Sequence, residues 1–502
     1  MVTSKFHKFL ILLPLTVALA SCGGGNGDSG DSSNNGNGGG NGSGTLSAFS
    51  PEQYLIGNDG SSGNISDGGQ LWLTDGTEAN TRKVKDVFPG DDADMREFTS
   101  VGNLLFFTAE DSSGNDRQLW VSDGSESGTL RLTENSTLKF ARMLTNVNGL
   151  LHFYAVDSST DLPALWSSDG TVAGTEQIVS TDISSDGIKL LTEFDDALFF
   201  SYHDSAGVGS ELWRSDPNGD TALFADIQTG IGTGSLYTCP DRMVEMNGYL
   251  YFAANEGTSE CGLWRTNGQI VGGNGQVEKV HHTSPDSVNY GPIRLAATDN
   301  KLFFLTRGFY GTPSVPSAIW VSDGTDQGTQ RIFESNDDYQ VLTGSSSEPT
   351  GILTAAGGYA YFYVRDLNRH NSNSVQLWYT DGTTAEMLVD LQNSVLGDYR
   401  VPSAVSGDRL FYIALRDDTS EDTITPNHGL WTAQGEQTKL LPTGIRTTGT
   451  RNTPMLPVAD GQTLIFRSQG EVWRTDGTDG GTGFIKDICP GPCDGFIGPV
   501  RD

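Results

Sequence analysis

The amino-acid sequence predicts an all-β fold, a single-ring β-propeller of about nine four-stranded blades. A motif of the form Leu-Trp-x-Ser/Thr-Asp-Gly-Thr recurs at intervals of about 50 residues, a period typical of propellers and other β-repeat arrays. Short apolar segments broken by Gly, Asn and Asp dominate the chain, and no stretch has the 3.6-residue periodicity of a long helix. The C-terminus also supplies a strand that the first unit lacks.

Each repeat unit can be divided into four strands. In the second unit, the expected strands span residues 96–102, 104–109, 118–122 and 129–133, and the first two meet at a Gly-Asn turn. Such a turn between apolar segments is the strongest short-range signal of a β-hairpin. A tryptophan stands in the third strand, where its large apolar surface is expected to fill the space between blades. All nine tryptophans occupy this position: Trp72, Trp120, Trp166, Trp213, Trp264, Trp320, Trp378, Trp431 and Trp473.

The two ends of the repeat region complement each other. The first unit has the strand-forming segments 52–59 and 70–76 but no good strand before them, and residues 496–502 fit the missing first strand. Closure of this kind removes exposed strand edges, whereas an open solenoid would need polar caps. Nine blades exceed the usual four to eight, so two smaller rings or one degenerate unit are alternatives. Because no linker interrupts residues 97–488, we expect one closed ring.

The units resemble the ELWxxDGT repeat, also called hyalin-like, of secreted bacterial proteins. The resemblance covers residues 50–502 and is literal at Glu211-Leu212-Trp213. Three units depart from the turn: one inserts Pro217, one has Asn267 in place of the aspartate, and the unit at 432–438 has lost it. The resemblance implies a propeller-like extracellular domain and no defined reaction.

The N-terminus has the features of a lipoprotein signal peptide. Lys5 and Lys8 flank the start of an apolar run, residues 9–20, that is short for a membrane span. The run leads into a sequence resembling the bacterial lipoprotein box, in which Cys22 is acylated and begins the mature chain; a chance cysteine after an ordinary secretory peptide is the alternative. We expect a signal peptide at 1–21, the lipidated cysteine and a Gly/Asn/Ser-rich tether at 22–48, and the propeller at 49–502. Gly23 favours the outer membrane, with the domain facing the periplasm or the cell surface.

The net charge limits the classes of binding partner, and the four remaining cysteines indicate disulfides. A net charge of −32 argues against nucleic acid and is compatible with cationic ligands and divalent metals. We expect a monomer that meets the membrane only through its lipid. In an oxidising compartment, Cys239–Cys261 and Cys489–Cys493 are the expected disulfides among three connectivities. Zinc at the second pair is the alternative, but no further His or Cys lies near it.

The motif residues are interpreted as scaffold, because a catalytic set need occur only once. The aspartate is expected to accept hydrogen bonds from its own turn, with Gly supplying positive φ and Thr bonding locally. No cofactor is firmly implied. Ca²⁺ is possible at such oxygen-rich turns, and more so at the denser acidic segment Asp91, Asp92 and Asp94, although loop charge is the default interpretation there.

Function is expected where the units differ. The loop between second and third strands and the connection to the next blade emerge at one end of each blade, which we name the loop face. The short turns, including the repeated Asp-Gly turn, form the turn face. Long loop-face segments of units five to eight bring aromatic, basic and acidic residues together, a composition that suits a glycan. The candidate ligand-binding residues are His281, His282, Tyr290, Arg307, Tyr310, Arg365, His370 and His428, accompanied by Arg369, Asp417 and Asp418.

The sequence therefore favours an envelope-anchored, non-catalytic binding or adhesion module for an extracellular glycan or a partner protein. A polysaccharide-acting enzyme with carboxylates near the central channel is a second hypothesis. A structural protein that bridges partners in the envelope is a third. The histidines could also form a metal site. No nucleophile motif or phosphate-binding loop is present, and no catalytic residue is assigned.

Cys239→Ala combined with Cys261→Ala is expected to lower the melting temperature, because a crosslink of this kind contributes about 2–4 kcal/mol. Calorimetry and thiol titration would measure the effect. An unchanged melt, together with free thiols in the parent protein, would exclude this disulfide.

Overall fold

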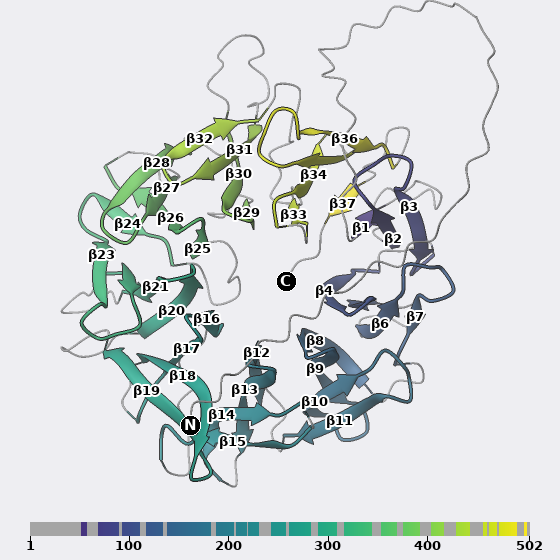
Figure 1. Ribbon diagram of the computed structural model, residues 1–502, viewed down its shortest axis with the longest axis horizontal. Helices are drawn as coiled ribbons and strands as arrows, with labels where there is room; N and C mark the ends of the chain where they lie inside the picture. Colours follow the sequence, from purple (N-terminus) through teal and green to yellow (C-terminus); the bar gives the residue numbers. More distant parts are fainter. Residues whose placement is uncertain are drawn as a thin grey trace, which may run out of the picture. The chain divides into compact units, whose positions relative to one another are not determined.

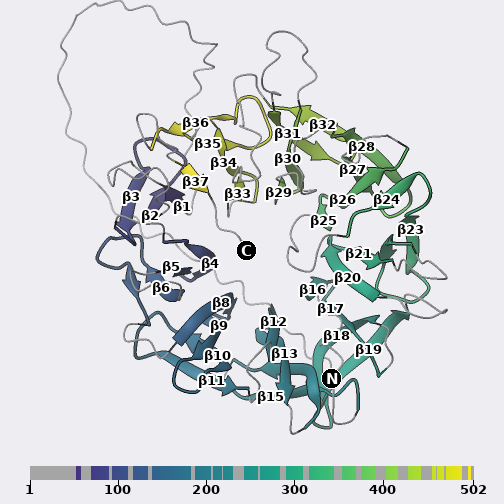
Figure 2. The ribbon, with the colours of Figure 1, turned by 180° about the vertical axis from the view of Figure 1, so that it is seen from behind.

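Nine antiparallel sheets follow one another around a ring in the computed structural model (Figure 1, Figure 2). The structure describes residues 52–57, 69–89, 93–110, 117–133, 138–181, 187–204, 207–217, 219–229, 242–257, 261–282, 290–308, 316–343, 353–368, 375–391, 403–415, 428–441, 455–458, 461–468, 471–488 and 496–498. These residues belong to one compact unit, Ser43–Asp502. None of the described residues forms a helix long and apolar enough to cross a membrane.

Each sheet is one blade, and its strands run in order from the channel outward. Blade 1 has β37 (Phe496–Gly498), β1 (Gln53–Gly57), β2 (Gln70–Thr74) and β3 (Arg82–Asp86); blade 2 has β4 (Arg96–Val101), β5 (Leu104–Ala109), β6 (Gln118–Ser122) and β7 (Leu130–Arg131). Blade 3 has β8 (Leu138–Val147), β9 (Leu150–Asp157), β10 (Leu162–Ser168) and β11 (Thr175–Ser180); blade 4 has β12 (Ile188–Phe194), β13 (Ala197–Asp204), β14 (Gly209–Ser215) and β15 (Thr221–Ala225).

The remaining blades repeat this order. Blade 5 has β16 (Val244–Met246), β17 (Tyr249–Ala254), β18 (Gly262–Val271) and β19 (Asn274–His282); blade 6 has β20 (Tyr290–Ala297), β21 (Leu302–Arg307), β22 (Ala318–Ser322) and β23 (Gln330–Glu334). Blade 7 has β24 (Tyr339–Val341), β25 (Leu353–Ala356), β26 (Tyr359–Asp366), β27 (Val375–Thr380) and β28 (Ala385–Asp390). Blade 8 has β29 (Ser403–Ser406), β30 (Arg409–Leu415), β31 (His428–Gln434) and β32 (Gln437–Leu440); blade 9 has β33 (Met455–Pro457), β34 (Leu464–Ser468), β35 (Glu471–Thr475) and β36 (Gly483–Lys486).

The second strand of each blade explains the apolar segments in the sequence. In β5, only Leu104 of the six residues is not fully buried, and β13 and β21 are similar. These strands have neighbouring blades on both faces, so they form continuous apolar runs without the alternation of a half-exposed strand. The outermost strands, such as β11, have no such cover and are mostly polar.

The motif tryptophans lie at the interfaces between blades. Trp120 of blade 2 shares an apolar cluster with Leu71 and Leu73 of blade 1, and Trp166 of blade 3 shares one with Phe106 of blade 2. The same relation holds for the later units, each tryptophan joining the preceding blade. The hydrophobic core is therefore a chain of inter-blade clusters, and each blade is stabilised mainly by its neighbours.

The ring closes between blade 9 and blade 1, as the sequence predicts. Strand β37 pairs with β1, with Gly498 opposite Ile56. Trp72 of blade 1 lies in a cluster with Ile465 and Val472 of blade 9, so the closing interface repeats the packing of the other interfaces. The predicted propeller of nine four-stranded blades is confirmed.

Blade 7 differs from the expected arrangement. Within the long loop-face segment before its motif, Tyr339–Val341 forms β24, which pairs with the C-terminal half of β26 at Val341↔Val364. Strand β25 pairs with the other half of β26. Because β26 is eight residues long and β25 covers only part of it, the Tyr-Gln-Val segment completes the innermost position of this blade.

Deletion of residues 494–502 is expected to destabilise the whole domain, because it removes β37 and exposes the closing interface around Leu55 and Trp72. A single melting transition lowered by several degrees is the expected calorimetric result. Deletion of residues 499–502 alone, which keeps β37, is the control. If the longer truncation melts like the full chain, the ring does not depend on this closure.

Candidate functional site

The recurring turn forms a closed set of hydrogen bonds. In blade 1, the Asp75 carboxylate accepts hydrogen bonds from the backbone N–H and the hydroxyl of Thr77, at 2.9 and 2.6 Å. The hydroxyls of Thr74 and Thr81 lie 2.6 Å apart, and Thr81 donates to the carbonyl of Thr77. These local bonds are the ones that the sequence predicts, and they use each carboxylate within its own turn. The same set surrounds Asp123, Asp169, Asp323 and Asp476.

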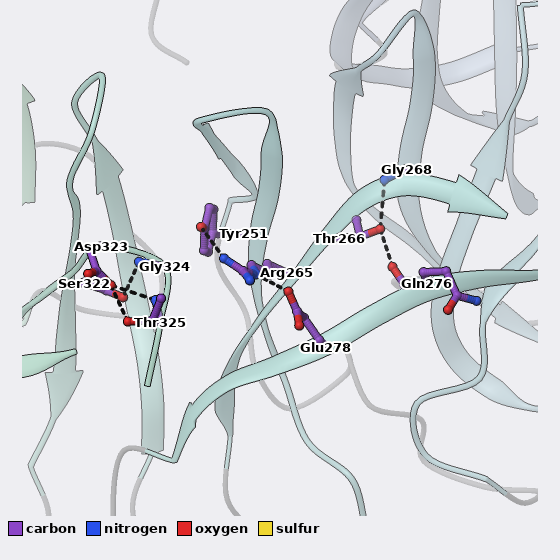
Figure 3. A network of polar contacts seen from close by, with 10 residues as sticks. All are labelled: Tyr251, Arg265, Thr266, Gly268, Gln276, Glu278, Ser322, Asp323, Gly324 and Thr325. Carbon is purple, nitrogen blue, oxygen red and sulfur yellow. Dashed lines mark hydrogen bonds and ion pairs between the residues drawn. The ribbon is translucent and has the colours of Figure 1, made fainter. Parts of the chain in front are cut away.

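The turn also packs against the preceding blade, as Figure 3 shows for blades 5 and 6. Gly324 has φ +95°, and a Cβ there would lie 2.2 Å from the hydroxyl of Tyr251. Arg265 donates to that hydroxyl at 3.5 Å and forms an ion pair with Glu278. Its guanidinium lies 4.2 Å from the centre of the Tyr249 ring. Glycine is required here both for its φ and for the close approach of Tyr251.

A side chain of the outermost strand reaches the turn of the next blade at several interfaces. At four interfaces it meets the third residue after the turn aspartate, and these contacts range from 2.7 to 3.3 Å. His281 takes this role in blade 5, and its ring also lies 5.5 Å from that of Trp320. The structure therefore places His281 in an inter-blade contact of the scaffold. The pairs are Lys85 with Glu126, His281 with Asp326, Lys439 with Asp479 and Lys486 with Glu78.

The other predicted ligand-binding residues are distributed over blades 5 to 8. Arg365 in β26 donates to the Gln340 side chain of β24 at 3.0 Å, and Arg307 ends β21. His282, Tyr290 and His428 lie at ends of β19, β20 and β31. Tyr310 and His370 lie outside the described residues, as do Arg369, Asp417 and Asp418.

The predicted disulfide and metal residues are only partly described. Cys261 is disulfide-bonded, while Cys22, Cys239, Cys489 and Cys493 lie outside the described residues. Asp91 and Asp92 also lie outside them, and Asp94 is described. Within the described ranges, no group of three or more His, Cys, Asp or Glu side chains is arranged to hold a metal ion.

The innermost strands of blades 2, 3 and 4 are irregular in the same way. Their pairing shifts register within β4, twice within β8, and within β12. Bulky residues with positive φ are conformational outliers, and bulges often re-aim side chains next to functional sites. Four such residues stand at these bulges: Glu97 (φ 54°), Phe140 (φ 55°), Met143 (φ 57°) and Leu190 (φ 61°).

Charged residues lie beside the bulges of blades 2 and 3, from the loop-face ends of β4, β5 and β6 to the middle of β8. We name as the bulged rim the residues Asp94, Arg96, Glu97, Glu110, Arg117, Phe140 and Arg142. Sequence reasoning singles out only Asp94 among them. The pattern Asp-x-Arg-Glu at 94–97 and Arg117 ahead of a motif strand are visible in the sequence, but the bulges that gather these residues are not.

Asp94 is held by two arginines. Arg96 Nη2 lies 2.7 Å from Asp94 Oδ2 and its Nε lies 2.8 Å from Oδ1, while Arg117 contacts Oδ2 as well. Arg117 Nη2 also lies 3.8 Å from Glu110 Oε1. Burial opposes ionisation, yet the hydrogen bonds from both arginines hold the pKa of Asp94 below its usual value. The carboxylate considered as a metal ligand is thus neutralised by protein cations.

The pKa of Glu97, in the same rim, is shifted in the opposite direction. Burial raises the pKa of its carboxyl, although the backbone N–H groups of Leu144 and Met143 and the charge of Arg142 partly counter the shift. Leu144 N–H donates to Glu97 Oε2 at 3.2 Å. Arg142 stacks over the Tyr154 ring at 4.2 Å. Phe140, two residues before Arg142 in the same bulged strand, has 51% of its surface exposed.

Comparison of the sequence with family models and with curated proteins finds no match in either. Among solved structures, the chain is similar to the β-propeller domain of the Trilobed protease from Pyrococcus furiosus, at 12% identity and a TM-score of 0.36, covering 69% of this chain and 96% of that one. The WD40 domain of SCAP from fission yeast gives 12% identity, a TM-score of 0.36, and coverage of 74% and 93%. A prolyl endopeptidase gives 10% identity and a TM-score of 0.40, with 75% of this chain and 54% of that chain covered. The fold assignment rests on the strand pairing itself, which defines a nine-bladed β-propeller.

Glu97→Gln is expected to stabilise the domain at pH 7 and to have no such effect near pH 4. Burial raises the pKa of the Glu97 carboxyl in the folded state above its ordinary value of 4.5. The stability that comes from the neutral carboxyl is therefore fully present below the unfolded-state pKa, and it is lost as the pH rises through the folded-state pKa. Glutamine keeps the acceptor for Leu144 N–H without a charge. The melting temperatures of the Glu97→Gln variant and the parent protein would be compared from pH 4 to 8. Substitution of the exposed Glu193 by Gln is the control. If the difference in melting temperature between Glu97→Gln and the parent does not grow with pH, the prediction is wrong.

Proposed function

We propose that the domain is a non-catalytic binding or adhesion module that recognises an extracellular glycan or a partner protein at its loop face. The observation that carries the proposal is the bulged rim. Conformationally strained residues persist only where the surrounding structure holds them, and they gather at ligand sites. At these bulges Phe140 is exposed and the Glu97 carboxyl is buried.

The chemistry of the bulged rim suits a polar polymer. The Phe140 ring offers a flat apolar surface, and guanidinium groups donate hydrogen bonds in a fixed planar geometry. The Nε of Arg117 is buried and has no hydrogen-bond partner among the described residues. A buried donor of this kind favours a water or a ligand hydroxyl as its acceptor. Binding sites for such ligands combine apolar surface with a few placed polar groups.

The described part of the first blade begins at the turn face. Gln53 pairs with Thr74, the residue immediately before the Asp75 turn, so the chain enters the ring at the turn face. We propose that Cys22 is acylated and that residues 22–48 tether the ring to the outer membrane. Secretion and anchoring of this kind agree with the resemblance to ELWxxDGT repeats.

A polysaccharide-acting enzyme is the second candidate, favoured by one observation. The environments of Asp94 and Glu97 push the two pKa values in opposite directions. Two carboxyl groups whose pKa values differ in this way can act as the acid and the base in glycoside hydrolysis. The ion pairs that neutralise Asp94 argue for recognition over catalysis.

Phe140→Ala is expected to weaken retention on the recognised polymer about tenfold, because truncating a central aromatic contact commonly costs more than 1 kcal/mol. The chain from residue 22, carrying Cys22→Ala to prevent acylation, would be incubated with envelope and extracellular polysaccharides, with and without Ca²⁺. Retention and released reducing ends would be measured in the same samples.

Phe484→Ala is the matched control, since Phe484 is a 40% exposed aromatic on the outermost strand of blade 9. Equal loss in both variants, or no loss in either, would remove the bulged rim from the binding site. New reducing ends, abolished by Glu97→Gln, would show that the enzyme hypothesis is the correct one.

A further inference from the structure

The innermost strands of blades 2, 3 and 4 share one irregular geometry. In each, a threonine lies two residues before the end of the strand, and the residue two positions before that threonine has a positive φ. The hydroxyl of Thr99 donates a hydrogen bond to the Leu144 carbonyl of blade 3 at 3.1 Å. In the same way, the hydroxyl of Thr145 donates to the Leu191 carbonyl of blade 4 at 3.5 Å. The three strands therefore present equivalent positions, one blade apart.

One of these equivalent positions holds a basic residue in all three blades. It comes just before the positive-φ residue, and its pairing partners in the second strand, two residues after the partner of the threonine, are Thr108, Tyr154 and Ser201. The strands that carry it lie nearest the centre of the ring (Figure 1). We name as the basic arc the residues Arg96, Arg142 and Lys189.

Positive charge is concentrated on these three strands. Strands β4, β8 and β12 carry four basic residues, the basic arc and Lys139, against two acidic ones, Glu97 and Glu193. The whole chain, in contrast, has 31 basic and 63 acidic residues. The Glu97 carboxyl accepts a hydrogen bond from Leu144 N–H, and Glu193 accepts one from Asp196 N–H in the hairpin turn at the turn face. The other half of these strands is therefore locally basic in a strongly acidic protein.

The two arginines of the basic arc are held in place and still reach solvent. Arg96 Nη2 lies 2.7 Å from Asp94 Oδ2, and the Arg96 side chain is 35% exposed. The Arg142 guanidinium lies 4.2 Å from the centre of the Tyr154 ring, and Arg142 is an exposed residue. Lys189 is half-buried. Cations that are already positioned lose little conformational entropy when an anion binds.

We propose that the basic arc recognises the anionic groups of an acidic glycan, the carboxylates of uronic acids or sulfate esters. This inference rests on the proposed glycan-binding function and names the chemical class of the ligand. One cation at the same position of three successive blades suits a polymer whose repeating units each carry a negative charge, and ionised hydrogen bonds to such groups are strong. Because the Debye length is about 8 Å at physiological ionic strength, charges close to the arc outweigh the net charge of −32.

Polygalacturonate and its fully methyl-esterified form test the ligand class, because they share one backbone and differ in charge. The chain from residue 22 that carries Cys22→Ala is expected to bind polygalacturonate about tenfold more tightly than the ester, since hydrogen bonds to charged groups are the stronger ones. Dextran sulfate and dextran give the same comparison for sulfate esters. Titration calorimetry would measure the affinities, and this comparison depends on no substitution in the ring.

Arg142→Gln combined with Lys189→Gln is expected to lower the affinity for the charged polymer about tenfold and to leave binding of the neutral polymer unchanged. Lys83→Gln combined with Arg331→Gln is the matched control. It removes one lysine and one arginine from exposed positions of the outermost strands β3 and β23, and it should bind like the parent chain. Melting temperatures would verify that both variants are folded.

The outcomes separate this inference from the proposed function. Tighter binding of a charged polymer, lost only in the arc variant, supports the inference, and the preferred polymer identifies the anion as carboxylate or sulfate. If the parent chain binds neutral polysaccharides as tightly as charged ones, the acidic class is wrong and glycan recognition stands. If it retains no polysaccharide, both are wrong. Tighter binding of polyglutamate than of either charged polysaccharide, or equal loss in the control variant, would also overturn the inference.

Discussion

The packing of one tryptophan against the preceding blade is the interaction on which the ring depends. Trp120 meets Leu71 of blade 1, Trp166 meets the cluster of Phe106, and Trp72 meets Ile465 across the closing interface. A single four-stranded sheet with apolar residues on both faces could not exist alone in water. Because each sheet is covered by its neighbours, every inter-blade interface contributes to stability, and the C-terminal strand β37 completes the blade at the closing interface.

The repeated Asp-Gly turn serves the same interface. Its carboxylate and hydroxyls bond within the turn, which makes the turn rigid, and outer-strand side chains such as Lys85 and Lys486 bond to its backbone. A rigid turn presents a constant surface to the preceding blade, so the spacing between blades is maintained around the ring. The most conspicuous motif of the sequence is therefore occupied by structural bonds, which leaves function to the places where the repeat is broken.

Those places lie at opposite ends of the ring. In blades 2 and 3, Glu97 is buried at the bulge of β4 and Phe140 is exposed at a bulge of β8. At the turn face, the blade 5 hairpin replaces the acidic turn with an uncharged aliphatic tip.

The sequence by itself determined the repeat, the nine blades, the place of the tryptophans and the closing strand, because each depends on local patterns of apolar residues and turn residues that recur at a constant period. It also indicated the bonds of the Asp75 turn, which involve residues close together in the chain. Only the tertiary structure decided that His281 contacts Asp326 of the next blade, that Tyr339–Val341 completes blade 7, and that Asp94, Arg117 and Arg142 gather beside Glu97. Strand bulges and contacts between blades depend on how neighbouring sheets pack, and no repeat pattern in one unit records the shape of the unit beside it.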